Sequence, residues 1–151
     1  MKTNAVFEEE GCWVKIPLRK MLRFMGLVSS VLFWVVASLS MLYNPWFSLT
    51  TNAFSDLGGR SANQPWIYNI GLMVTGGVAL LYALSLIDDA KNKAQVVGGG
   101  FMFMAGVFLA LIGIYPSGTG PHTFVSTWFF AQADLAIVTW GIGLVLENVK
   151  V

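Results

Sequence analysis

Long apolar runs alternate with short polar segments along this chain. Four stretches, 24–43, 66–87, 96–115 and 123–146, contain a single charged residue between them, Asp134. Each stretch has the length of roughly 20 residues that a helix needs to cross a hydrocarbon layer about 30 Å thick. All five prolines lie outside these stretches, as expected for uninterrupted helices. The pattern predicts an all-α protein, an integral membrane bundle of four transmembrane helices.

The same pattern divides the chain into three parts. Residues 1–23 form a charged cytoplasmic segment, 24–146 the four-span transmembrane domain, and 147–151 a short cytoplasmic tail. We expect the N-terminal segment either to lie along the membrane interface or to form a solvated tail. The second span carries small residues at four-residue spacing, which predicts close packing against other helices: Gly71, Thr75, Ala79 and Ala83.

Basic residues predict the orientation of the spans. Eight of the nine lysines and arginines lie before the first span, between the second and third, or after the fourth, and only Arg60 lies in the other loops. Because basic loops stay on the cytoplasmic side, both termini should be cytoplasmic. We therefore expect a multi-pass protein of the cell membrane whose first and third connections face outward.

Composition and charge exclude several classes of function. A net charge of +1 gives no basic surface for nucleic acid. With one cysteine and one histidine there is no zinc-binding pattern, and no phosphate-binding loop is present. We expect no metal and no cofactor. The expected partners are membrane lipids, together with a second copy of the chain or another membrane subunit.

Three ionisable residues in the expected outer loops form the candidate site: Asp56, Arg60 and His122. Asp56 and Arg60 would face each other in a helix, whereas the glycines between them favour a turn in which Asp56 accepts backbone hydrogen bonds. His122 is either a helix-capping residue or a base, since it titrates near neutrality. We predict that the three side chains converge in one ligand-binding site. Ser126, one helical turn below His122, would complete a Ser/His/Asp set.

Asp134 is the one charged residue inside a span. It lies about 16 Å beyond Thr123 along the helix axis, near the middle of the membrane. Because a charged carboxyl exposed to lipid costs several kcal/mol at that depth, we expect Asp134 to face the other helices, protonated or paired. Thr127 shares its side of the helix, and Gln132 points to nearly the opposite side. Asp134 is then either a structural hydrogen-bonding group or a proton- or ligand-handling group.

Short motifs resemble an uncharacterised family. They are Ser55-Asp56-Leu57-Gly58 after the first span, Tyr68-Asn69-Ile70-Gly71-Leu72 in the second, and Gly113-Ile114-Tyr115-Pro116 leaving the third, followed by His122 and Phe129-Phe130. This pattern resembles the multi-pass membrane proteins catalogued as domain of unknown function 998. The resemblance implies a helical membrane protein without an established reaction. Members of that family usually continue with further spans, which implies that a dimer or a partner could complete the bundle.

Two classes of function fit these observations. We favour a non-catalytic membrane component that binds a lipid, a small ligand or a protein partner through its outer loops, because no nucleophile or metal signature is present. The alternative is a membrane-embedded hydrolase or transferase that uses His122 and Asp56 as catalytic residues. Proton-coupled transport around Asp134 is disfavoured, because the spans contain no paired charges.

Overall fold

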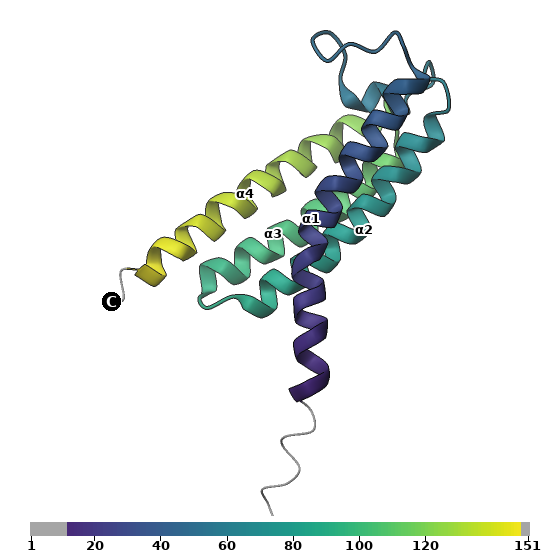
Figure 1. Cartoon of the computed structure of the whole chain (residues 1–151). Coiled ribbons are helices and arrows are strands. Elements are labelled where there is room, and N and C mark those ends of the chain that lie inside the picture. Colours follow the sequence, from purple (N-terminus) through teal and green to yellow (C-terminus); the bar gives the residue numbers. More distant parts are fainter. Residues whose placement is uncertain (1–11, 149–151) are drawn as a thin grey trace, which may run out of the picture.

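The computed structural model describes residues 12–148 and contains four long helices that run alternately up and down (Figure 1). They are α1 (Cys12–Tyr43), α2 (Pro65–Asp89), α3 (Lys93–Ile114) and α4 (His122–Asn148). A short 3₁₀ helix, η1 (Phe54–Gly58), lies in the connection between α1 and α2. Residues 12–148 contain no strand, so the predicted all-helical architecture is confirmed.

The ends of the helices lie close to the predicted span ends, except at the start of α1. Residues 12–23 continue the first span as helix, and residues 1–11, where the rest of the expected interfacial segment falls, lie outside the described part. Pro65 begins α2 at a position where its missing N–H is not needed. The side chain of Asn92 caps α3 by accepting a hydrogen bond of 3.0 Å from the Gln95 N–H.

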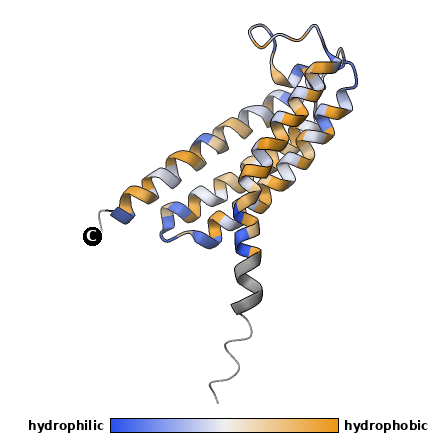
Figure 2. Ribbon diagram, viewed as in Figure 1, coloured by the Kyte–Doolittle hydropathy of each residue, from blue (hydrophilic) through white to orange (hydrophobic). Residues whose placement is uncertain are grey.

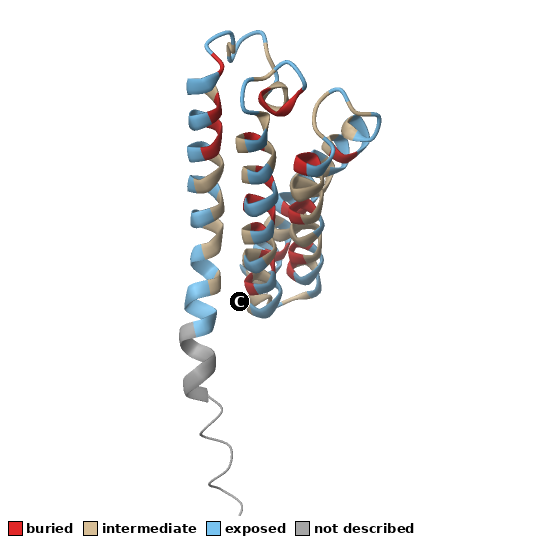
Figure 3. Ribbon diagram, turned by 90° about the vertical axis from the view of Figure 1, so that its right-hand side faces the viewer, coloured by how far each residue is buried: buried red, intermediate tan, exposed pale blue. Residues whose placement is uncertain are grey.

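The outer surface of the bundle is apolar. Figure 2 shows apolar residues along all four helices, and Figure 3 shows that much of the helix surface is exposed. Leu42 and Ile137, for example, are 76% and 72% exposed. All four helices are long and apolar enough to cross a membrane, with the first span running over Leu18–Tyr43. Contact with lipid explains this exposure, which a water-soluble bundle would avoid. The chain is a multi-pass membrane protein.

Close packing occurs between helices that follow each other in the chain, with α1 on α2, α2 on α3 and α3 on α4. Gly71 of α2 faces Val36 of α1, and a Cβ built at Gly76 would lie 2.7 Å from the backbone nitrogen of Ala110 in α3. The other three members of the small-residue stripe on the second span are buried. The packing role predicted for this stripe is therefore confirmed.

The predicted direction of Asp134 is wrong. The Asp134 side chain is exposed on the outward side of α4, whereas Ala136, two positions further on, is buried. Two positions correspond to about 200° around a helix, so the two residues lie on nearly opposite sides. Two residues before Asp134, α4 turns Gln132 inward, and the Gln132 Oε1 is buried without a hydrogen-bond partner in the described part of the chain. Exposure of a charged carboxyl to lipid is unfavourable, so another group must cover Asp134. That group can belong to a different molecule.

Candidate functional site

We call the end of the bundle with the connections 44–64 and 115–121 the distal end, and the opposite one the terminal end. At the distal end, Asp56 lies in η1 and stabilises this turn by two hydrogen bonds with Ala53. Its Oδ2 accepts a hydrogen bond of 3.0 Å from the Ala53 N–H, and its own N–H donates to the Ala53 oxygen at 2.9 Å. This confirms the interpretation of residues 55–60 as a turn rather than an α-helix. Arg60 follows the turn and is exposed.

The two distal connections meet at Asp56. The Ser117 hydroxyl donates a hydrogen bond of 3.2 Å to Asp56 Oδ1, and Gly59 packs against Ser117. On the other side of the turn, Asn69 of α2 donates from Nδ2 to the Gly58 oxygen at 3.0 Å. Segments far apart in the sequence, around residues 55–59, 69 and 117, therefore form one packed unit.

His122 begins α4 at the same end. Its Nδ1 lies 2.8 Å from the Tyr115 oxygen. A carbonyl oxygen only accepts, so Nδ1 carries the proton of this hydrogen bond. The Ser126 hydroxyl donates at 2.9 Å to the backbone oxygen of His122, not to its ring. Within residues 18–148 no hydrogen bond joins His122 to Asp56 or Arg60. The three residues share the distal end, and their convergence in one site stays a prediction.

A cavity of about 700 Å³ lies among all four helices and η1. Most of its lining side chains are apolar, including Phe33, Leu72, Leu109 and Phe129. Two more lining residues, Trp34 of α1 and Phe130 of α4, are 57% and 63% exposed, so the cavity is open to the surroundings along these two helices. We call it the α1–α4 cleft. Because all four helices are membrane spans, these surroundings are the hydrocarbon of the bilayer.

The polar side chains along the cleft are Ser29, Ser30, Thr75 and Ser126 and, towards the distal end, Ser55, Tyr68 and His122. Ser29 and Thr75 donate their hydroxyl hydrogens to backbone oxygens at 3.2 and 2.7 Å, and Ser30 does the same at 3.0 Å. These hydroxyls are therefore satisfied by backbone oxygens, of the same helix for Ser30 and Thr75 and of α2 for Ser29, and the wall around them is effectively apolar. Ser55 and His122 line the cleft at its distal rim. The cleft thus combines an apolar wall with a polar rim, which is the arrangement that suits an amphiphilic molecule.

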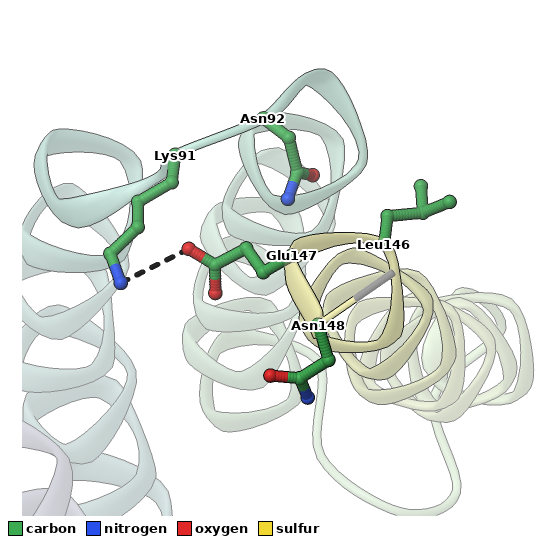
Figure 4. A pocket seen from close by; sticks show the side chains of 5 residues that line it. All are labelled: Lys91, Asn92, Leu146, Glu147 and Asn148. Carbon is green, nitrogen blue, oxygen red and sulfur yellow. Dashed lines mark ion pairs between the residues drawn. The ribbon is translucent and has the colours of Figure 1, made fainter. Parts of the chain in front are cut away.

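The terminal end has a second, polar hollow, which sequence reasoning did not find. Figure 4 shows Lys91, in the α2–α3 connection, pointing to Glu147 of α4, with 3.0 Å between Nζ and Oε1. Gln95 also donates to Glu147, at 3.2 Å, and Asn92 donates to the Gly143 oxygen at 2.9 Å. These contacts join the α2–α3 connection to the end of α4, which is a structural role.

Two further ion pairs fasten α1 to α2 at the terminal end. Arg23 binds the Asp89 carboxylate through two nitrogens, each at 2.6 Å, and Arg19 lies 2.5 Å from Asp88. From the sequence alone, these arginines indicate only the orientation of the spans. Asp88 and Asp89, at the end of the second span, are the sequence signal for these ion pairs. They bring negative charge to the same side of the membrane as the basic segment.

Asn44 is a polar residue that no sequence pattern singles out. Its side chain is fully buried, and its Nδ2 donates to the backbone oxygens of Ser40 and Asn63 at 2.8 and 3.0 Å. Its Oδ1 accepts from the Asn63 N–H at 2.6 Å and from Trp46 Nε1 at 3.0 Å. One amide therefore ties the first residues of the α1–α2 connection to its last ones.

The described residues contain no cluster of three histidine, cysteine, aspartate or glutamate side chains that could hold a metal ion.

Four apolar spans, packed in sequence order around a cleft that opens to lipid, define a multi-pass helical membrane protein. Residues 27–148 match the family described as "Protein of unknown function (DUF998)". The match covers more than half of the chain, and the chain belongs to this family. The comparisons with curated proteins and with solved structures find no match. The family brings no activity with it, so a function has to be argued from the cleft and its rim.

Proposed function

We propose that this protein binds a membrane lipid or another amphiphile in the α1–α4 cleft. The apolar part of the ligand lies between the helices, and its polar group lies at the distal rim beside Ser55 and His122. The observation that carries the proposal is the cleft itself, an apolar hollow of about 700 Å³ between membrane spans. This volume falls within the range of about 300–1,000 Å³ that is typical of small-molecule sites.

The chemistry of the wall and rim supports this class of ligand. A molecule dissolved in the bilayer can enter sideways between α1 and α4, and its chain then contacts side chains such as Phe33 and Phe129. At the rim, the free His122 Nε2 and the Ser55 hydroxyl can both form hydrogen bonds with a polar head group. Arg60, at the same end, supplies a positive charge that would favour an anionic head group.

The hydrogen bonds at the distal end do not favour the hydrolase or transferase alternative. Catalysis by a Ser/His/Asp set requires the nucleophile to contact the imidazole and the carboxylate to orient it. Ser126 donates instead to a backbone oxygen, and Asp56 accepts from Ala53 and Ser117. A non-catalytic binding role therefore fits the side chains better.

Filling the cleft tests the proposal. Ala133 lines the cleft, so Ala133→Phe would place a phenyl ring in it. The control is Gly77→Phe, at an exposed position of α2 where a Cβ meets nothing within 4 Å. Each protein is purified in mild detergent, and its bound lipids are extracted and quantified by mass spectrometry. We expect wild type and Gly77→Phe to retain about one molecule of the same lipid class per chain, and Ala133→Phe to lose it.

Two results would contradict the proposal. One is equal retention of the same lipid by Ala133→Phe and by the control. The other is a wild-type protein, extracted and washed gently, that carries only the lipid mixture of the surrounding membrane in non-stoichiometric amounts.

A further inference from the structure

The outward side of α4 carries a polar stripe through the middle of the membrane. Asp134 is exposed, and it lies 12 residues after His122, about 18 Å along the axis of the 27-residue helix. Thr127, seven residues earlier, is also exposed. Gly141, seven residues later, has nothing within 4 Å of the position of a Cβ. We define these three residues as the α4 stripe.

Asp134 needs a partner that its own chain does not supply. A charged carboxyl that faces hydrocarbon near the bilayer centre is strongly unfavourable. The other charged residues within 18–148 lie at the terminal end of the first span (residues 19–23), in the end turns of the other helices or in the connections, away from mid-span. The group that covers Asp134 must therefore come from a second molecule that lies in the membrane.

The spacing of the stripe matches the geometry of a helix pair. Residues that recur every seven positions stay on the seam between two supercoiled helices. A residue without a side chain at one of these positions lets the backbones approach closely, as Gly141 would. Val138 and Val145, which are 57% and 61% exposed, lie four residues after Asp134 and Gly141 and complete the seam.

We propose that two copies of this chain pair through their α4 stripes in parallel, with their Asp134 carboxyl groups hydrogen-bonded to each other. A protonated carboxyl is both donor and acceptor, so it is complementary to a second copy of itself. All copies of a membrane protein share one orientation, and a two-fold axis along the membrane normal then places each residue of the stripe opposite its own counterpart. A second copy thus covers Asp134 without a basic residue.

The α4 stripe and the α1–α4 cleft lie on adjacent sides of α4. On this helix the cleft is lined by Ser126, Phe129 and Ala133, which lie about 80–140° around the helix from Asp134, and by Phe130, which lies about 40° from it. The two sites therefore meet at Phe130, and each proposal is tested at residues that only its own site contains, Ala133 for the cleft and Asp134 and Gly141 for the stripe.

Cysteine cross-linking tests the stripe directly. In a background with Cys12→Ser, Gly141→Cys places a thiol on the stripe, and the control Ile142→Cys places one at the same depth but about 100° away. Ile142 is 51% exposed and a Cβ at Gly141 meets nothing within 4 Å, so both thiols are accessible from the membrane. After oxidation in membranes, we expect a disulfide-linked dimer from Gly141→Cys and little or none from Ile142→Cys. Equal cross-linking at both positions, or none at either, would overturn the proposal.

Substitution of Asp134 provides the second test, with the dimer dissociation constant measured in detergent or lipid discs. Asp134→Asn keeps a donor and an acceptor and should dimerise nearly as well as wild type. Asp134→Leu removes the hydrogen bond and should weaken the dimer about threefold to about twentyfold. Its monomer should unfold like wild type, because Asp134 is exposed on its own chain. A monomeric wild type, a dimer that tolerates Leu as well as Asn, or a different protein bound at the stripe would refute the self-association.

Discussion

Replacement of Asn44 by alanine should destabilise the distal end more than any other single amide replacement in the α1–α2 connection. Asn44→Ala removes four hydrogen bonds at once, two of them with the backbone of Asn63. The other two join Asn44 to Ser40 and Trp46. Because the Asn44 side chain is fully buried, water cannot readily replace the lost amide at that position.

The loss of stability in Asn44→Ala depends on which hydrogen-bond partners of Asn44 remain buried without a replacement. Each of the two bonds to the Asn63 backbone contributes about 0.5–1.5 kcal/mol, and a buried group left without a partner costs about 1–3 kcal/mol. Trp46 is 42% exposed, so its indole N–H can turn to water or lipid head groups at little cost. We therefore expect a loss of about 2–4 kcal/mol in the free energy of unfolding.

The matched control is Asn63→Ala. It removes one exposed side-chain bond, from Asn63 Nδ2 to the Tyr43 oxygen at 3.1 Å, and leaves the backbone bonds to Asn44 in place. We expect it to cost less than about 1 kcal/mol. Reversible unfolding in mixed micelles, followed by circular dichroism, measures both variants. If Asn44→Ala loses no more stability than Asn63→Ala, the amide does not hold the connection together and the reasoning fails.

Two further predictions concern orientation and the terminal end. In intact cells with Cys12→Ser, an impermeant thiol reagent should label Ser117→Cys and not Lys91→Cys, because eight of nine basic residues lie on the terminal side; the opposite labelling would reverse the topology. Arg23→Glu should lower the unfolding midpoint by placing like charges beside each other, and the double exchange Arg23→Glu with Asp89→Arg should restore much of it. Equal midpoints for the single and double variants would show that the pair contributes nothing.

The sequence predicts the spans well because one local property decides them. A helix in lipid must satisfy its own backbone and carry few charges for about 20 residues, and each span meets this condition without reference to the others. The turn at Asp56 is predictable for a similar reason, since the Ala53 N–H that it accepts from lies only three residues away. The packing of Gly71 follows from small-residue spacing within one helix.

The features that sequence reasoning missed depend on how the helices are placed relative to one another. Arg23 and Asp89 are 66 positions apart, and only the packing of α1 on α2 brings them together. Asn44 has four partners, but its burial depends on how the connection folds back to Asn63. No local sequence pattern predicts the α1–α4 cleft, because its walls come from all four helices and η1.

The two polar residues at the centre of α4 show how one helix can serve two neighbours. Gln132 and Asp134 are two positions apart, so their side chains point about 200° away from each other. One of them must face away from α3 whichever way the helix turns. The structure turns Gln132 inward and leaves the more costly group, Asp134, on the lipid side. A lipid-facing Asp134 is unfavourable for a single chain in the membrane. In the proposed dimer, the second chain covers the carboxyl and removes this cost. Under the proposed pairing, the bilayer and a second chain together explain the outward Asp134, which the fold of one chain does not explain.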